Sequence, residues 1–160
     1  MIKKTYENNL NYIFDGERRS AKYSLNNGET WMNHGEYCEC LAKSVLNLQA
    51  TKDANTAFDA GDDIPELHAS VKSFGCGLTE CKNMPNNPAD FLKAFWERDK
   101  STTFIWVYDY GEMVDLWFMD RTEFTEFVNT FATWDNYCVK FRIKTCNNKI
   151  NNYLERKIAG

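Results

Sequence analysis

An acidic turn and the strand expected after it hold the residues of this sequence that are best suited to chemistry. Asp63 lies in the turn 61–64, and Lys72 lies near the end of the alternating segment 68–73. Side chains two positions apart on a strand share a face, so Ser70 and His68 should point the same way as Lys72. Carboxylates can hold Mg²⁺ against a phosphate, and a lysine can orient or deprotonate the water that the metal acidifies.

Two glutamates stand in the first turns of a helix expected over residues 34–48. Glu36 and Glu39 follow a polar start, and apolar side chains then recur at helical spacing up to Leu48. A carboxylate in this position could serve a metal site on the neighbouring sheet. An acidic side chain in the first turn is also favoured by the helix dipole whatever the function, so both interpretations of Glu36 stay open.

Local signals also predict the elements that follow the acidic turn. Asn87 is a good capping side chain, and the proline after it has no N–H to satisfy, so a helix is expected over 88–99. β-Branched and aromatic residues followed by regular alternation predict a hairpin within 102–119. Asp120 with Glu123 three residues later is a capping box that begins a further helix.

The two ends of the chain carry weaker signals. Residues 1–30 are polar with isolated apolar positions and are expected to form a helix or a short hairpin laid on the body. Residues 137–145 alternate as a strand does, and residues 149–157 are expected to form a short closing helix. The segments 1–30 and 137–160 are therefore expected to be peripheral additions.

The order helix, Asp63, strand ending in Lys72, helix, hairpin and helix resembles the PD-(D/E)XK nuclease superfamily over residues 34–131. In that family a glutamate-bearing helix packs beside a sheet, an aspartate ends one strand, and the next strand carries (D/E)-x-K. The resemblance implies a restriction-endonuclease-like core in which Asp63, Lys72 and Glu36 are catalytic. It also implies a Mg²⁺ cofactor, with Mn²⁺ as an alternative.

One position departs from the family pattern. Ser70 stands where an aspartate or glutamate is usual, which removes one direct metal ligand. Some restriction enzymes of the superfamily with serine or threonine there recruit a glutamate from a helix instead. The resemblance therefore makes Glu36, Glu39 and Glu80 candidate metal ligands beside Asp63.

A basic strand face is the second feature that suits nucleic acid. Lys140, Arg142 and Lys144 alternate with apolar residues and should share one face, which could lie along phosphates. Together with Ser70 and His68 they are candidate substrate-binding residues. Alternating lysine and arginine can equally be the solvated face of an amphipathic strand, and that alternative remains open.

Composition bounds the class of protein. The chain has 160 residues, which suits one domain, and it has a net charge of −4. Negative charge works against indiscriminate nucleic-acid binding but is compatible with carboxylates gathered on a metal ion or facing a basic protein. No apolar run is long enough to span a membrane, and no secretory signal is apparent, so a cytoplasmic protein is expected.

The cysteines do not favour a structural zinc site. Cys38 and Cys40 are spaced too closely for the usual ligand pair, and the Cys76 to Cys81 spacing has no second pair beside it. In a reducing compartment the six cysteines should therefore be thiols.

These observations lead to one expectation and one rival. We expect an α/β (α+β) single domain over 1–160 with a central mixed sheet flanked by helices, acting as a metal-dependent DNA endonuclease of restriction, phage or mobile-element type. An enzyme that cuts both strands should be a homodimer, because one site faces one strand. The rival is a nuclease-like binding protein without catalysis, such as an acidic phage inhibitor that occupies a basic host defence protein.

Overall fold

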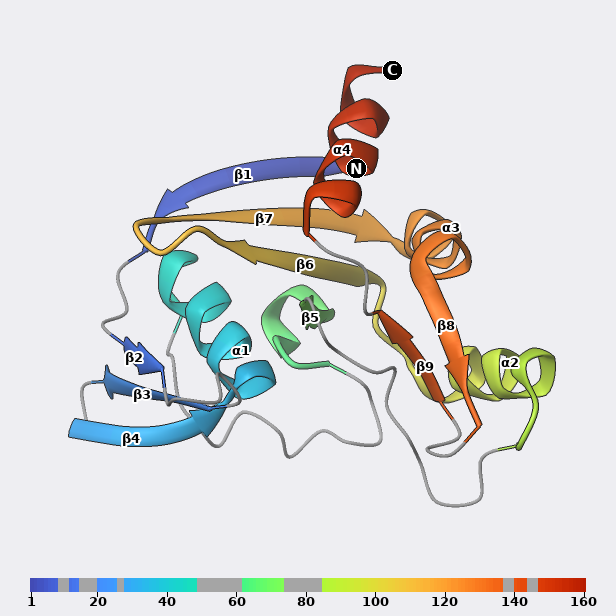
Figure 1. Ribbon diagram of the computed structural model, residues 1–160, viewed down its shortest axis with the longest axis horizontal. Helices are drawn as coiled ribbons and strands as arrows, with labels where there is room; N and C mark the ends of the chain where they lie inside the picture. The colour runs from blue at the N-terminus through green and yellow to red at the C-terminus, as the bar shows by residue number, and fades with distance from the viewer. Residues whose placement is uncertain are drawn as a thin grey trace.

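The computed structural model describes residues 1–8, 12–14, 20–25, 28–48, 62–73, 85–136, 140–143 and 147–160. At its centre lies a four-stranded mixed sheet in the order β1-β7-β6-β5 (Figure 1). Its strands are β1 (Ile2–Glu7), β5 (Ala69–Ser73), β6 (Thr103–Asp109) and β7 (Met113–Asp120). β5 and β6 run parallel, whereas β6 with β7 and β7 with β1 run antiparallel. The fold is α+β, as the sequence predicts.

Two helices begin where their capping residues predict. The Asn87 side chain accepts a hydrogen bond from the Asp90 amide at 3.0 Å at the start of α2 (Pro88–Arg98). At the start of α3 (Arg121–Phe131), Asp120 and Glu123 each accept a hydrogen bond from the other's amide, at 2.8 and 3.1 Å. These side chains satisfy amides that have no partner within the helix, so both predicted caps are confirmed.

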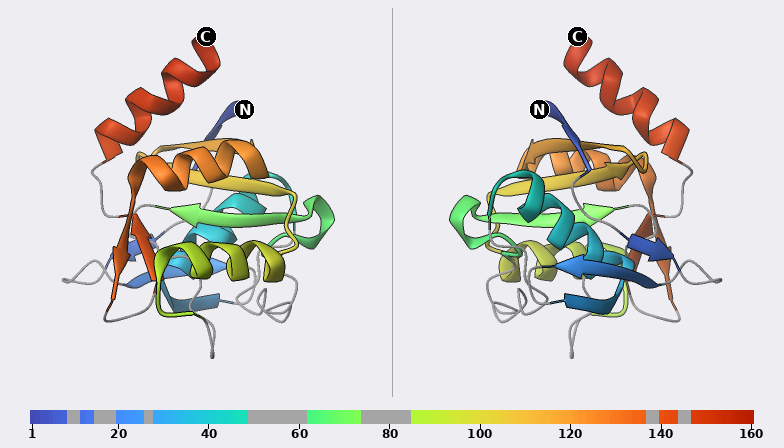
Figure 2. Two further views of the ribbon diagram at one scale, coloured as in Figure 1. Left: turned by 90° about the vertical axis from the view of Figure 1, so that its right-hand side faces the viewer. Right: turned by 90° about the vertical axis from the view of Figure 1, so that its left-hand side faces the viewer.

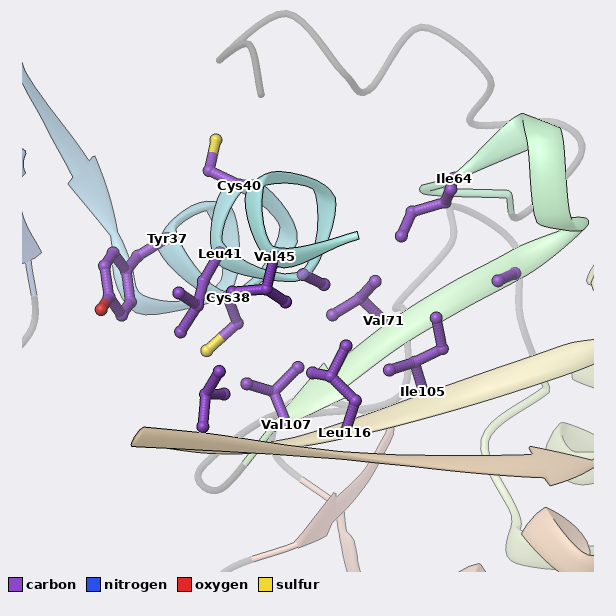
Figure 3. Packing of buried hydrophobic residues seen from close by; sticks show 13 residues of the cluster. Tyr37, Cys38, Cys40, Leu41, Val45, Ile64, Val71, Ile105, Val107 and Leu116 are labelled. Atoms are coloured by element: carbon purple, nitrogen blue, oxygen red, sulfur yellow. The ribbon is translucent and has the colours of Figure 1, made fainter. Parts of the chain in front are cut away.

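One face of the main sheet packs against α1 (His34–Val45). Side chains from α1, β5, β6 and β7 point toward one another there, and most of them are aliphatic (Figure 3). Leu41 and Val45 of the helix meet Val71, Ile105 and Leu116 of the sheet. The predicted helix 34–48 is therefore present, and it buries the apolar positions that its spacing indicated.

The other face of the sheet packs against aromatic side chains from α2 and α3. Phe104 and Phe124 stack with their ring centroids 4.3 Å apart, and Trp106 and Phe127 lie 5.0 Å apart. The hairpin of β8 (Ala132–Asp135) and β9 (Lys140–Ile143) and the helix α4 (Asn147–Ala159) complete this second core. The strand β8 was not predicted from the sequence.

A smaller antiparallel sheet lies on the α1 side of the molecule. It consists of β2 (Tyr12–Phe14), β3 (Ser20–Leu25) and β4 (Gly28–Asn33), and α1 follows β4 directly. Figure 2 shows α1 with this small sheet on one side of the molecule and α2, α3, β8 and β9 on the other. The main sheet is thus covered on both faces.

The N-terminal segment departs from expectation in one respect. The hairpin expected within residues 1–30 is present as β2 and β3. Ile2–Glu7, however, is an edge strand of the main sheet and pairs with β7, so this part of 1–30 is not a peripheral addition. The sequence of β1 did not reveal the strand, because β1 lies at an edge of the sheet and none of its side chains is fully buried.

The C-terminal predictions are confirmed in outline. Of the strand expected over 137–145, residues 140–143 form β9, while 137–139 and 144–146 lie outside the described residues. The closing helix is present as α4, and its Ile150 and Leu154 are buried in the aromatic core. In the described part of the chain no helix is long and apolar enough to cross a membrane.

Candidate functional site

Asp63 is fixed at the outer edge of β5. Its Oδ2 atom accepts hydrogen bonds from the Val71 amide at 2.6 Å and from Ser70 Oγ at 3.2 Å. The next residue, Ile64, pairs with Ala69 through two backbone hydrogen bonds of 2.9 and 3.2 Å. Asp63 therefore lies beside β5 as a residue of a neighbouring antiparallel strand would.

Glu39 of α1 reaches the Asp63 carboxylate. The two side chains form a hydrogen bond, and the pKa of Glu39 is raised to about 7. Burial is the largest cause of this rise, and the negative charge of Asp63 is the next. When Glu39 is protonated it can donate to Asp63, and a cation placed between the two carboxylates would stabilise both in their ionised form.

Two lysines face this carboxyl pair. The positive charges of Lys72 on β5 and Lys43 on α1 both act to lower the Glu39 pKa, against the effect of burial. Lys43 lies one helical turn after Glu39 on the same side of α1, and only 6% of its surface is exposed. Lys72 was predicted from the sequence. Lys43 was missed because a helix lysine is usually solvated and its spacing gives no sign of burial.

The helix glutamate that meets Asp63 is Glu39, one turn later than the predicted catalytic Glu36. The charge of Glu36 acts on Cys40, whose pKa is raised to about 11 by burial first and then by Glu39, with a smaller effect from Glu36. The two glutamates are three positions apart, so they lie on neighbouring parts of the same side of α1, about one turn apart along its axis. Helical spacing alone could not decide which of them faces the acidic turn.

The predicted substrate-binding residues near Asp63 divide into a buried and an exposed one. Ser70 is 1% exposed and donates a hydrogen bond to Asp63, so it helps to hold the carboxylate in position. The His68 side chain is 73% exposed, and its Nδ1 atom lies 3.3 Å from Asp62 Oδ2. Of the two, only His68 is open to a large substrate.

The basic strand lies away from this site. Arg142 of β9 forms an ion pair with Asp135 of β8, with Nε 2.8 Å from Oδ2. Its neighbours Phe141 and Ile143 belong to the aromatic core on the opposite face of the sheet from α1. Lys140 lies on the same strand, while Lys144 and the candidate metal ligand Glu80 lie outside the described residues.

The donor set fits a hard divalent cation with an incomplete protein shell. In the described residues no group of three or more histidine, cysteine, aspartate or glutamate side chains could hold a metal ion. Glu39 and Asp63 nevertheless provide two carboxylates in contact. Mg²⁺ is commonly held by one or two carboxylates, with water and substrate phosphate supplying the remaining oxygens. Cys38 and Cys40 are buried thiols and add no oxygen ligand of the kind that Mg²⁺ prefers.

No protein-family model, curated protein or solved structure matches the chain. What the site can do therefore rests on its own geometry. That geometry consists of two hydrogen-bonded carboxylates, two lysines and a serine at one edge of the sheet.

Proposed function

We propose that this protein is a metal-dependent DNA endonuclease that hydrolyses phosphodiester bonds. The observation that carries the proposal is the convergence of Glu39, Asp63 and Lys72 from a helix, a turn and a strand. A structural role alone does not require two carboxyl groups in contact, because burying a like-charged pair is costly without a cation or a proton between them.

The chain's own residues divide the work as follows. Glu39 and Asp63 would hold Mg²⁺ or Mn²⁺, and Ser70 with the Val71 amide keeps the Asp63 carboxylate in place. When bound, the metal would acidify a water and stabilise the negative charge that develops on the phosphate. Lys72 would position the attacking water by donating a hydrogen bond to it. The positive charge of Lys43 acts with that of Lys72 against the rise of the Glu39 pKa.

The arrangement of elements supports the proposed kinship with PD-(D/E)XK nucleases. A glutamate-bearing helix packs beside the sheet, an aspartate lies next to the strand that ends in lysine, and α2 separates that strand from its parallel neighbour β6. The departure at Ser70 leaves two carboxylates where the family pattern has three acidic positions. We therefore propose Glu39 as the helix glutamate recruited to this site.

Ser70 and the net charge of −4 favour a second candidate function. In it the nuclease-like site has lost turnover, and an acidic surface binds a basic protein, for example a nucleic-acid defence factor of a phage host. Glu39 and Asp63 would then keep their shared proton instead of binding a metal. The two functions differ in a measurable way, because only the first requires a divalent cation.

The test is cleavage of supercoiled plasmid by the purified chain with Mg²⁺, Mn²⁺ or EDTA. We expect nicking that needs the metal and falls by about 100-fold or more in Asp63→Asn and Glu39→Gln. Glu66→Gln is the matched control, because Glu66 is exposed and close in sequence but outside the carboxyl pair. Failure of the unaltered chain to cut with either metal would refute the proposal.

Metal binding can be followed without activity. Because the pKa of Glu39 is raised to about 7, Glu39 is protonated at pH 6, and loading the site with Mn²⁺ at that pH should release a proton. Calorimetry in two buffers of different ionisation heat measures that release directly. Glu39→Gln should abolish the proton release, whereas Glu66→Gln should leave it unchanged; binding without proton release in the unaltered chain would argue against a site at Glu39.

The proposal extends to partners and place of action. DNA is the expected substrate, and a homodimer is expected if both strands are cut at one locus. We expect action in the cytoplasm, in a restriction or phage-defence setting. Sedimentation with and without a DNA duplex measures the assembly, and a monomer that cuts one strand only would remove the need for a dimer.

A further inference from the structure

A second polar cluster begins one residue before Asp63 and ends in His68. The Asp62 carboxylate accepts a hydrogen bond from Ser101 Oγ at 2.7 Å through Oδ1, and its Oδ2 lies 3.3 Å from His68 Nδ1. Ser101 is fully buried, and only 11% of the Asp62 side chain is exposed, in contrast to the open His68 ring. The Asp62 carboxylate thus contacts Nδ1 of the His68 ring on its protein side, and Nε2 is the ring nitrogen that could contact a substrate.

The backbone of His68 is fixed as firmly as its ring. Its φ of 47° lies in the left-handed region, which side chains other than glycine seldom adopt. The His68 carbonyl accepts hydrogen bonds from the amides of Thr102 and Thr103 at 2.9 and 3.1 Å, and its amide donates to the Pro65 carbonyl at 3.2 Å. Such conformations persist where surrounding contacts enforce them, and they cluster at functional sites.

Hydrogen bonds connect Ser101, which holds Asp62, to neighbouring elements of the fold. The Ser101 amide donates to Asp99 Oδ1 at 2.9 Å, and the Arg121 guanidinium donates to the Asp99 carbonyl at 2.7 Å. Asp62 is therefore oriented through the connection between α2 and β6 and the first residue of α3. An exposed histidine of no consequence needs no such support, since water satisfies its ring nitrogens.

His68 and Lys72 lie on either side, along the chain, of the point at which Asp63 is bonded. Asp63 is bonded at Ser70 and Val71, so His68 lies before this point and Lys72 after it. At roughly 3.3 Å per residue, their backbones are on the order of 13 Å apart with the carboxylate between them. In an in-line displacement at phosphorus the attacking and leaving oxygens also lie on opposite sides.

We infer that His68 is the proton donor to the leaving oxygen, with Asp62 and Ser101 as its positioning residues; this rests on the proposed nuclease function. Water forms the new bond to phosphorus and gives up its proton to solvent. The bond between phosphorus and the leaving oxygen breaks, its electron pair stays on that oxygen, and the oxygen takes the proton from His68 Nε2. Solvent then returns a proton to Nε2, while Asp62 holds the ring through Nδ1.

The experiment compares two leaving groups. One oligonucleotide carries the natural linkage at the position the unaltered chain cuts, and the other has sulfur in place of the leaving oxygen. A thiolate leaves without a proton, so it does not need the donor. We expect His68→Asn to lose roughly 100-fold or more in kcat on the natural linkage, but less than about 10-fold on the sulfur linkage. Asparagine is chosen because it tolerates the left-handed backbone.

The controls separate this inference from the proposed function. Asp63→Asn should lose activity on both linkages, and the exposed neighbour variant Glu66→Gln should lose it on neither. Equal losses for His68→Asn on the two linkages, or a change in KM alone, would overturn the inference and leave the nuclease proposal standing. No cutting of either linkage by the unaltered chain overturns both.

A spectroscopic measurement tests the positioning residues apart from catalysis. In ¹⁵N-resolved NMR spectra, the neutral His68 ring, the form that remains after Nε2 has given up its proton, should keep its proton on Nδ1, facing Asp62. Asp62→Asn should disturb that tautomer, and Ser101→Ala should loosen it, with smaller kcat losses than His68→Asn. An Asp62→Asn ring indistinguishable from the unaltered one would show that Asp62 does not position His68.

Discussion

The side chains on the α1 face of the main sheet are mostly aliphatic, whereas those on the α3 face are mostly aromatic. The buried Lys43, Asp63 and Ser70 lie with α1 and β5 at the margin of the first face. The second face is built from interlocking rings such as Phe104 and Phe124. We expect the aromatic face to dominate stability because its rings are large and buried, while the aliphatic face borders an edge at which charged groups gather.

The largest expected effect comes from the aromatic face. Phe124→Ala removes a ring that is 1% exposed and stacked on Phe104, and it should lower the free energy of unfolding by about 3–5 kcal/mol. Denaturant titration measures this loss, and the exposed Thr122→Ala on the same helix is the control. The loss should not depend on pH. A cost below about 1 kcal/mol would mean that the second core does not dominate stability.

The carboxyl pair should instead make stability depend on pH. The folded-state pKa of Glu39, about 7, is above its ordinary value of 4.5, so the folded chain binds the extra proton between these values. Stability should therefore fall as pH rises from 4.5 to 7, by roughly 3 kcal/mol for the whole shift, and then level off. Glu39→Gln should remove this fall in thermal unfolding across that pH window, while Glu36→Gln keeps it.

Replacing Lys43 tests whether charges on the α1 face control the pH dependence of stability. Its positive charge opposes the rise of the Glu39 pKa, so Lys43→Met should raise that pKa further. Stability should change little at pH 5, where Glu39 is protonated, and should drop by about 1 kcal/mol more than in the unaltered chain at pH 8. Chemical denaturation at the two pH values measures the difference. An equal loss at both would indicate that Lys43 contributes only packing.

The smallest expected effect lies at a helix start on the aromatic side. Asp120→Ala removes the side chain that accepts from the Glu123 amide and should cost about 1 kcal/mol. The loss should be the same at pH 5 and pH 8, because this cap lies with α3, on the opposite face of the main sheet from Glu39. Asp120→Asn is the matched control, since asparagine also caps well. A large pH dependence of the loss in Asp120→Ala would contradict the expectation that only the α1 face makes stability depend on pH.

Signals that act within a few residues of sequence predicted the structure well. Asn87 and Asp120 mark helix starts because a cap needs only its own turn, and the alternation within 102–119 predicted β6 and β7. The pairing of β1 with β7 was missed because it joins residues far apart in the sequence. Likewise, no local sequence pattern predicts β8, the strand that pairs with β9.

The candidate site was predicted in part for the same reason. Asp63, Ser70 and Lys72 lie within ten residues, and strand alternation relates them. Which helix glutamate meets Asp63 depends on the rotation of α1 about its axis, and that is set by packing against the sheet. The burial of Lys43 is decided by tertiary contacts in the same way.

The edge position of β1 has a consequence for the order in which the protein takes shape. Thr5 bonds to Asp115, and these residues are 110 positions apart in the sequence. At about 5–20 residues per second, roughly 6 to 22 seconds of synthesis separate a strand from the partner it must find. β1 is thus synthesised long before β7, the strand with which it pairs. The pairing of β1 with β7 should be a slow step of folding, because contacts between residues distant in sequence form slowly.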